Sequence, residues 1–338
     1  MFNFLRRFAK SPTVDVTPPP FNPDLFLRQL EWTAVRKLDG QLQGDYRTLF
    51  RGAGLMLADL REYQMHDDVR HIDWNVTARM RTPYVREHEE DREISIWFLV
   101  DLTGSIHFGS SAVTKQQLAM NFVAVLARLF TRHGNRVGAI LYAGPSSQAS
   151  LVIPVRSGRK QVLHIIEQMH QLSEKKPQGE TSLSDLFQLA SMAIKRRSTV
   201  FVISDFISSP GWDKPIHQLS NRHDVIAARL LDPAENELPA SGIMLIQDSE
   251  TGEQVFVDSE DKGFRQRFIE HAEAHATRLS HIFAQSSVDC IELDTSESVH
   301  DALMRYLLLR KRKVSLTRGS SLHNSTANQS HVQQNKKI

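Results

Sequence analysis

The 338-residue sequence contains one cysteine, Cys290. A single cysteine cannot form an intramolecular disulfide, and it cannot supply the several thiolates of a structural zinc site. The sequence also lacks an apolar run near the roughly twenty residues that span a bilayer, and its start lacks the hydrophobic middle of a signal peptide. We therefore expect a soluble protein in a reducing compartment, which predicts a cytoplasmic location.

An excess of charge of either sign is missing as well. Lys and Arg number 41 and Asp and Glu number 39, so the formal net charge is only +2. This balance does not indicate nucleic-acid binding. A phosphate-binding loop of the P-loop type is also absent, so any ATP hydrolysis would have to come from a partner. The hydrophobic content of 41% is sufficient for a substantial core.

Composition and patterning divide the chain into four parts. Residues 1–21 are predicted to be a disordered basic leader, for which a peripheral contact with an anionic membrane is the alternative. Residues 22–92 are predicted to hold one amphipathic helix, at 22–38, followed by a β-rich subdomain. Residues 93–313 are predicted to form an α/β domain with a hairpin insertion near 242–258. Residues 314–338, rich in Ser, Asn, Gln and Lys, are predicted to be a disordered tail.

The α/β domain is predicted from apolar strands that alternate with helical patterns. This order favours right-handed crossovers and a doubly wound, mostly parallel, Rossmann-like sheet. Two of its strands are continuous apolar runs that end in a carboxylate, at Asp101 and at Asp205. Such runs are typical of central parallel strands, and in open α/β sheets ligands bind where those strands end.

Further oxygen-bearing side chains accompany the two aspartates. Thr103 and Ser105 follow the first strand, and Thr181 lies at the start of a helical pattern. Taken alone, Thr181 is more typical of a helix N-cap than of a ligand. Taken together, the five side chains are hard oxygen donors that suit Mg²⁺, with Mn²⁺ as a second choice. The predicted metal site therefore consists of Asp101, Thr103, Ser105, Thr181 and Asp205.

This spacing resembles the metal-ion-dependent adhesion site of von Willebrand factor A domains. The resemblance implies that Asp101, Thr103 and Ser105 form the first loop of the site, Thr181 the second and Asp205 the third. It also implies that hydroxyls bind the metal directly, that the aspartates act largely through waters, and that a partner's acidic side chain completes the coordination. Thr103 stands where that family usually has serine, and its stiffer side chain is expected to retune the affinity for metal.

Several separated segments also resemble the domain-of-unknown-function 58 family, whose members carry such a stretch ahead of an A-type domain. The matching segments lie at 61–63, 67–74, 77–79, 230–233, 238–239 and 248–253. The resemblance implies an adaptor that works with a MoxR-type AAA+ ATPase in complex assembly or cofactor insertion. Within the second and third segments, Arg70, Asp73, Trp74 and Arg79 are interpreted as a clasp between the two parts of the chain, with a docking surface as the alternative.

The sequence-based conclusion is a non-enzymatic adaptor that binds a protein partner through Mg²⁺. A metal-dependent phosphohydrolase is the alternative enzyme, but that class typically needs a second carboxylate two residues after the first, where this chain has Thr103. A metal-free structural interaction module is the other alternative. Metal dependence of partner capture would separate it from the adaptor.

Overall fold

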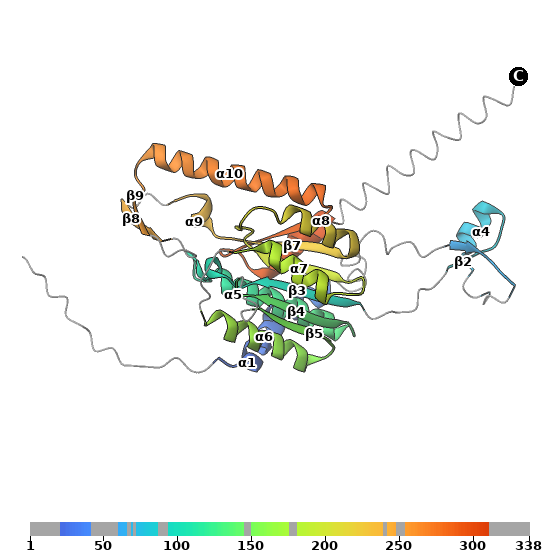
Figure 1. Cartoon of the computed structure of the whole chain (residues 1–338). Helices are drawn as coiled ribbons and strands as arrows, with labels where there is room; N and C mark the ends of the chain where they lie inside the picture. The colour runs from blue at the N-terminus through green and yellow to red at the C-terminus, as the bar shows by residue number, and fades with distance from the viewer. Residues whose placement is uncertain are drawn as a thin grey trace, which may run out of the picture.

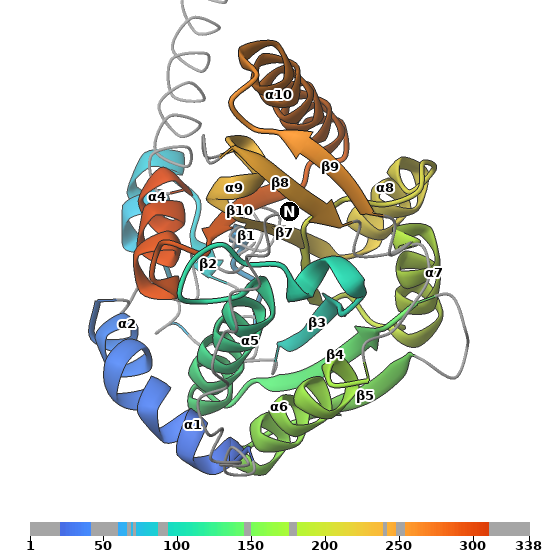
Figure 2. The ribbon, with the colours of Figure 1, turned by 90° about the vertical axis from the view of Figure 1, so that its left-hand side faces the viewer.

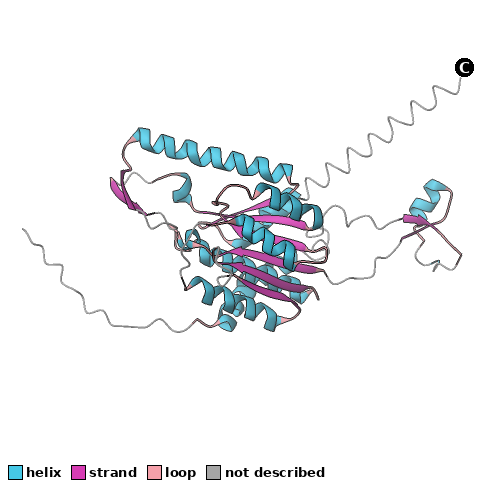
Figure 3. Ribbon diagram, viewed as in Figure 1, coloured by secondary structure: helices cyan, strands magenta, loops and turns pink. Residues whose placement is uncertain are grey.

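The computed structural model describes residues 21–41, 60–65, 69, 72–86, 94–144, 150–175, 181–238, 242–247 and 254–310. The predicted leader, apart from Phe21, and the predicted tail lie outside these residues. Within them, a six-stranded sheet lies between two layers of helices (Figures 1 and 3). The α/β expectation for the second half of the chain is confirmed.

The order of strands in the sheet decides where a ligand can bind. Every neighbouring pair is parallel except the last, between β4 and β5. The chain passes from β3 to β4 and β5 on one side, and then returns to β6 on the other, so the switch point lies between β3 and β6. Across the sheet the strands are β10 (Asp289–Asp294), β7 (Asp224–Leu231), β6 (Thr199–Ser204), β3 (Ser95–Asp101), β4 (Arg136–Tyr142) and β5 (Leu151–Arg156).

Helices cover both faces of the sheet (Figure 2). Successive side chains of a strand point to opposite faces, so Phe98 of β3 packs into one core and Leu99 into the other. The first core lies beneath α5 (Lys115–Arg132), α6 (Arg159–Ser173) and the helix at 299–310. The second lies beneath α7 (Leu183–Ala193), α8 (Asp213–Arg222) and α10 (Lys262–Gln285).

The amphipathic helix predicted at 22–38 is present and continues to residue 41. It consists of α1 (Pro23–Leu30), a π-helical segment (Glu31–Val35) and α2 (Arg36–Gln41). The π-helical segment presents Glu31 to Arg128 of α5 and Arg159 of α6, and the carboxylate accepts hydrogen bonds from both guanidinium groups. These half-buried ion pairs hold the helix against the first core.

The predicted β-rich subdomain is described at 60–65, 69 and 72–86. A short antiparallel pair joins β1 (Leu60–Glu62) to β2 (Tyr84–Arg86), as a β-rich segment requires. Between them lies α4 (Trp74–Met80), a helix that the sequence analysis did not predict. The reason is local, because the Asp73 carboxylate accepts a hydrogen bond from the Val76 N–H at 3.3 Å and caps the first turn.

The clasp predicted from Arg70, Asp73, Trp74 and Arg79 is not the arrangement found. Trp74 is 68% exposed and Arg79 is exposed, whereas a clasp would bury both. Asp73 is buried as a helix cap, and Arg70 lies outside the described residues. Asp73 therefore caps the start of α4, and Trp74 lies on the exposed surface of that helix.

The hairpin predicted near 242–258 is confirmed. Strands β8 (Ile243–Gln247) and β9 (Gln254–Asp258) pair antiparallel, and the turn between them lies outside the described residues. Ser259 closes the base of the hairpin, because its N–H and hydroxyl both donate to the Gly242 carbonyl, at 2.9 and 2.8 Å. Among the helices that the structure describes, none combines the length and the apolar character needed to cross a bilayer.

The edge strand β5 approaches β4 closely at Gly138. A Cβ placed on this glycine would lie 2.8 Å from the Ile153 carbonyl oxygen and 3.0 Å from the Val155 nitrogen. The register between the strands shifts at the same point, next to Pro154 of β5. Only a residue without a side chain fits this irregularity.

We expect Gly138→Ala to lower the free energy of unfolding by about 1–3 kcal/mol, since backbone atoms would have to move apart. Chemical denaturation measures this change. Gly40→Ala is the matched control, because a Cβ there meets nothing within 4 Å and alanine favours the helix. Equal stability of the two variants would contradict the close approach.

Candidate functional site

The first loop begins where β3 ends. Asp101 and Thr103 are almost fully buried, at 3% and 1% exposure. The N–H and the hydroxyl of Thr103 both donate to Asp101 Oδ1, at 3.1 and 2.7 Å. An aspartate that binds the backbone two residues further on forms a tight turn, and a short 3₁₀ helix (Gly104–His107) follows directly. The turn therefore holds the Thr103 hydroxyl oxygen beside the Asp101 carboxylate.

The second loop brings Thr181 to the first. Its side chain is fully buried, and its hydroxyl donates to the Thr103 hydroxyl oxygen at 2.7 Å. The expectation that Thr181 opens the helix is corrected, since α7 begins at Leu183 and its N-cap is Ser182. Because Ser182 satisfies the first turn of α7, the Thr181 side chain is directed to the first loop instead.

The third loop begins where β6 ends, on the other side of the switch point. The Ser204 hydroxyl donates to Asp101 Oδ2 at 2.9 Å and accepts the Phe206 N–H at 2.9 Å. Asp205 is 5% exposed, and its Oδ1 accepts the Ile207 N–H at 3.1 Å. Ser204, which the sequence analysis did not single out, thus joins the third loop to the first.

The backbone of the third loop is strained at Phe206. Its φ is 61°, in the left-handed region that a bulky side chain rarely adopts. The ring is held by Trp212 and Phe283, whose centroids lie 5.7 and 5.0 Å away. Strain of this kind persists where packing enforces it, and it is common at functional sites. Here it turns the chain immediately after Asp205.

Four of the five predicted site residues, Asp101, Thr103, Thr181 and Asp205, are therefore buried together at the ends of β3 and β6. Ser105 lies in the 3₁₀ helix and is partly buried. Among the described residues, no hydrogen bond joins its hydroxyl to the other four, and its role stays a prediction.

The two aspartates influence one another electrostatically. Burial raises the pKa of Asp101 to about 6, and the negative charge of Asp205 contributes to the rise, against the hydrogen bonds from Thr103 and Ser204. Two buried carboxylates that repel each other are stabilised by a cation. The local electrostatics therefore favour a positive charge between the ends of β3 and β6.

One positive charge is already present in the form of Lys115, which the sequence analysis missed. Its side chain is fully buried, and its ammonium donates to Asp205 Oδ2 at 3.1 Å and to the Glu235 carboxylate. Glu235 lies on the short helix α9 (Pro233–Asn236). Lys115 is the first residue of α5, directly after the N-cap Thr114. A cation is unfavourable at a helix N-terminus. A lysine directly after the expected N-cap could therefore have indicated, from the sequence, that acidic side chains lie nearby.

The donors present agree in chemical type with Mg²⁺ or Mn²⁺, which take carboxylate and hydroxyl oxygens. Within the described part of the chain, no group of three or more His, Cys, Asp or Glu side chains gathers to hold a metal. A metal at this position would therefore depend on the hydroxyls of Thr103 and Thr181. Asp101 Oδ1 already accepts two hydrogen bonds and Oδ2 one, so its main structural effect is to orient hydroxyls.

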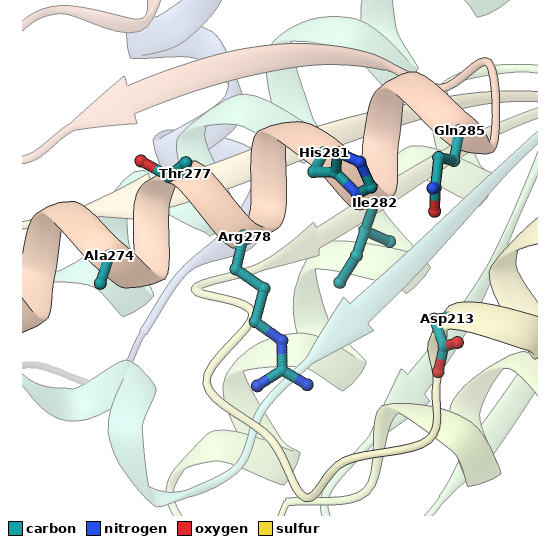
Figure 4. A pocket seen from close by; sticks show the side chains of 7 residues that line it. All are labelled: Asp213, Ala274, Thr277, Arg278, His281, Ile282 and Gln285. Carbon is teal, nitrogen blue, oxygen red and sulfur yellow. The ribbon is translucent and has the colours of Figure 1, made fainter.

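A separate hollow of about 660 Å³ lies between α10 and the start of α8 (Figure 4). Its lining includes Asp213, Arg278 and His281, and none of the five predicted site residues takes part in it. The hollow is thus distinct from the buried cluster at the strand ends.

Comparisons with known proteins match most of the chain. A family model described as "Protein of unknown function DUF58" matches residues 59–278. An uncharacterized protein of Mycobacterium bovis is 32% identical over 311 residues, which cover 90% of this chain and 97% of that protein. An uncharacterized protein of Mycobacterium avium is 29% identical over 120 residues, which cover 35% of this chain and 69% of that protein.

Solved structures give a weaker likeness. The conserved hypothetical protein BatB from Bacteroides thetaiotaomicron aligns with a TM-score of 0.42 at 14% identity, covering 65% of this chain and 99% of that chain. An aerotolerance-related membrane protein from Bacteroides fragilis aligns with a TM-score of 0.41, also at 14% identity, covering 63% and 98%.

Proposed function

The chain belongs to the DUF58 family of proteins of unknown function, and we propose that it is a non-enzymatic protein that binds other proteins. In this proposal a Mg²⁺ or Mn²⁺ ion at the ends of β3 and β6 binds an acidic side chain of the partner. The residues proposed to hold the ion, directly or through water, are Asp101, Thr103, Ser105, Thr181 and Asp205.

The observation that carries the proposal is the chain of hydrogen bonds from Thr181 through Thr103 to Asp101. It joins residues about eighty positions apart in sequence and keeps their oxygens within 2.7 Å of one another at each step. Hydroxyls that only filled a core would be expected to bond to nearby backbone carbonyls. Their convergence beside two carboxylates at a topological switch point is typical of a binding site.

Each side chain has a definite task in this proposal. Asp101 orients the Thr103 hydroxyl, and Ser204 orients Asp101 from the neighbouring strand. Thr181 adds a second hydroxyl oxygen, and its carbonyl accepts the Ser209 N–H at 3.1 Å, which ties the second loop to the third. The metal, when bound, supplies positive charge and an open coordination position for a carboxylate.

The phosphohydrolase alternative receives no support from the geometry. Such an enzyme typically needs a second carboxylate two residues after the strand-end aspartate, as its acid or base. The residue two positions after Asp101 is Thr103, whose hydroxyl is committed to the Asp101 carboxylate.

The metal part of the proposal is tested by titration calorimetry with Mg²⁺ and Mn²⁺. We expect Asp101→Ala to weaken binding by about 10- to 100-fold, because the Thr103 hydroxyl loses its orientation. Asp213→Ala, at an exposed position of α8, is the control and should leave affinity unchanged. Absence of metal binding by the unaltered protein, or equal affinities of the two variants, would contradict the metal site.

The partner part is tested separately. On the strength of the family resemblance, we propose a MoxR-type AAA+ ATPase as the partner. A purified ATPase of that type should bind the unaltered protein in Mg²⁺, and chelation or Asp101→Ala should abolish binding. Binding that persists unchanged in the chelator would favour a metal-free interaction module instead.

A further inference from the structure

We propose that Lys115 is a built-in cation of this site, one that competes with a divalent metal for Asp205 and that releases Asp205 but keeps Glu235 as its partner when the metal binds. This inference rests on the proposed metal site and concerns its regulation. It assigns roles to two residues, Lys115 and Glu235, outside the predicted ligand set.

The first observation is the position of the ammonium. Lys115 Nζ lies 3.1 Å from Asp205 Oδ2, and its side chain has no exposed area. The other oxygen of Asp205 accepts the Ile207 N–H at 3.1 Å. A metal or metal-bound water that approaches Asp205 therefore meets an oxygen already engaged by a positive charge. Two positive charges that share one carboxylate in a buried site repel each other strongly.

The second observation is that the ammonium has two acidic partners, Asp205 and Glu235, which come from different segments of the chain. Glu235 also accepts a hydrogen bond from Lys115 Nζ, and 27% of its side chain is exposed. It comes from α9, which begins at the end of β7, whereas Asp205 follows β6. When a metal satisfies Asp205, Glu235 offers the ammonium a partner that requires no large movement. A buried ammonium without any partner would be far less favourable.

The third observation is the charge balance. Asp101, Asp205 and Glu235 supply three carboxylates, and within this described cluster Lys115 supplies the one ammonium. A divalent cation would add two positive charges, which brings the cluster of three carboxylates and one ammonium to neutrality. The metal and Lys115 are thus able to be present together, provided that the ammonium releases Asp205 and keeps its contact with Glu235.

The fourth observation is that the positive charge of Lys115 is electrostatically unfavourable at the start of α5. Lys115 occupies the first helical position, where the helix dipole disfavours a cation, although Thr114 and Gln117 form a complete capping box. The carboxylates that hold Lys115 must offset this cost. The arrangement is therefore explained by the site rather than by the helix.

The two residues make opposite predictions for metal affinity. Removing the ammonium in Lys115→Met should tighten Mn²⁺ binding by roughly tenfold or more, because a competing charge is lost. Glu235→Gln should weaken Mn²⁺ binding several-fold, because Lys115 then pairs with Asp205 alone. In the double variant the effect of Glu235→Gln should be much smaller, since the ammonium through which it acts is gone.

The experiment measures free Mn²⁺ by electron paramagnetic resonance during titration of the full chain, with Lys160→Met, an exposed lysine of α6, as the control. Thermal melting with and without Mn²⁺ gives a second readout, and Mn²⁺ should raise the melting temperature more in Lys115→Met than in the unaltered protein. If Lys115→Met does not fold, the Glu235→Gln variant decides, because it keeps the Lys115–Asp205 pair.

Each outcome bears on one of the two proposals. Suppose that the unaltered protein binds Mn²⁺. If its affinity is then unchanged in Glu235→Gln, or is not tightened in a folded Lys115→Met, the role of Lys115 is overturned and the proposed metal site is retained. Mn²⁺ binding by Lys115→Met alone supports the role of Lys115 and overturns metal binding by the natural protein. If neither protein binds Mn²⁺, both proposals fail.

Discussion

Phe201→Ala is expected to lower the free energy of unfolding by about 4 kcal/mol, within the usual range for deleting a buried aromatic ring. Phe201 lies in β6 and is fully buried in the first core. Its ring centroid lies 5.7 Å from that of Phe98, 5.9 Å from Phe130 and 6.1 Å from Phe122. Alanine would remove these ring contacts and leave a cavity between β3, β6 and α5, which the rigid sheet cannot close.

Chemical denaturation measures this loss, and two variants control for it. Phe201→Leu keeps most of the volume and should cost about 1–2 kcal/mol. Phe256→Ala on the hairpin removes the same ring from a position that is 74% exposed, and should change stability by no more than about 0.5 kcal/mol. Comparable losses in the two alanine variants would show that Phe201 is not a central core residue.

Asp232→Ala is expected to lower the free energy of unfolding by about 3 kcal/mol, because several buried hydrogen bonds to a charged group are lost together. The Asp232 carboxylate is fully buried. It accepts the Ser110 N–H at 2.9 Å, the Ala234 N–H at 3.0 Å and the Thr295 hydroxyl at 2.8 Å, and it also accepts the Ser110 hydroxyl. Three segments that follow β3, β7 and β10 thus meet at one side chain.

The pH dependence of stability identifies the charged form as the stabilising one. Burial raises the pKa of Asp232, whereas the hydrogen bonds from Ser110, Thr295 and the Ala234 N–H lower it. The hydrogen bonds together outweigh burial, so the pKa of Asp232 lies below its ordinary value. The stabilisation is therefore present above the unfolded pKa of about 4 and is lost as pH falls through the folded pKa. Denaturation at a series of pH values should show the stability difference between the unaltered protein and Asp232→Asn shrinking below about pH 4. A difference independent of pH would contradict this assignment.

Much of the sheet was predictable, because the physical signals in its strands are strong. Ile96–Val100 and Val200–Ile203 are continuous apolar runs, and the structure buries both as central parallel strands. The hairpin at 243–258 was predictable from two strand patterns on either side of Gly252. α4 was missed because its seven residues are too few for a clear helical period, and its cap, Asp73, also fits a turn.

The candidate site was predictable to the extent that strand ends meet at one edge of a parallel sheet. This rule brings Asp101 and Asp205 together, and the structure places them as neighbours across the switch point. The rule says nothing of helix starts, so it missed Lys115. The helical pattern, in turn, predicted that α7 begins at Thr181, two residues before its observed start at Leu183. Pairings such as Lys115 with Glu235, which are 120 positions apart, depend on tertiary packing that local patterns do not carry.

Pro154 in the edge strand β5 limits how copies of this protein can assemble. An edge strand with free N–H groups can add a strand from another molecule, which leads to open-ended aggregation. Proline has no N–H to donate, and the shift of register beside Gly138 interrupts the straight edge that a new strand would need. Growth of the sheet past β5 is therefore disfavoured, and side-chain contacts are favoured over extension of the sheet for a partner that approaches this side.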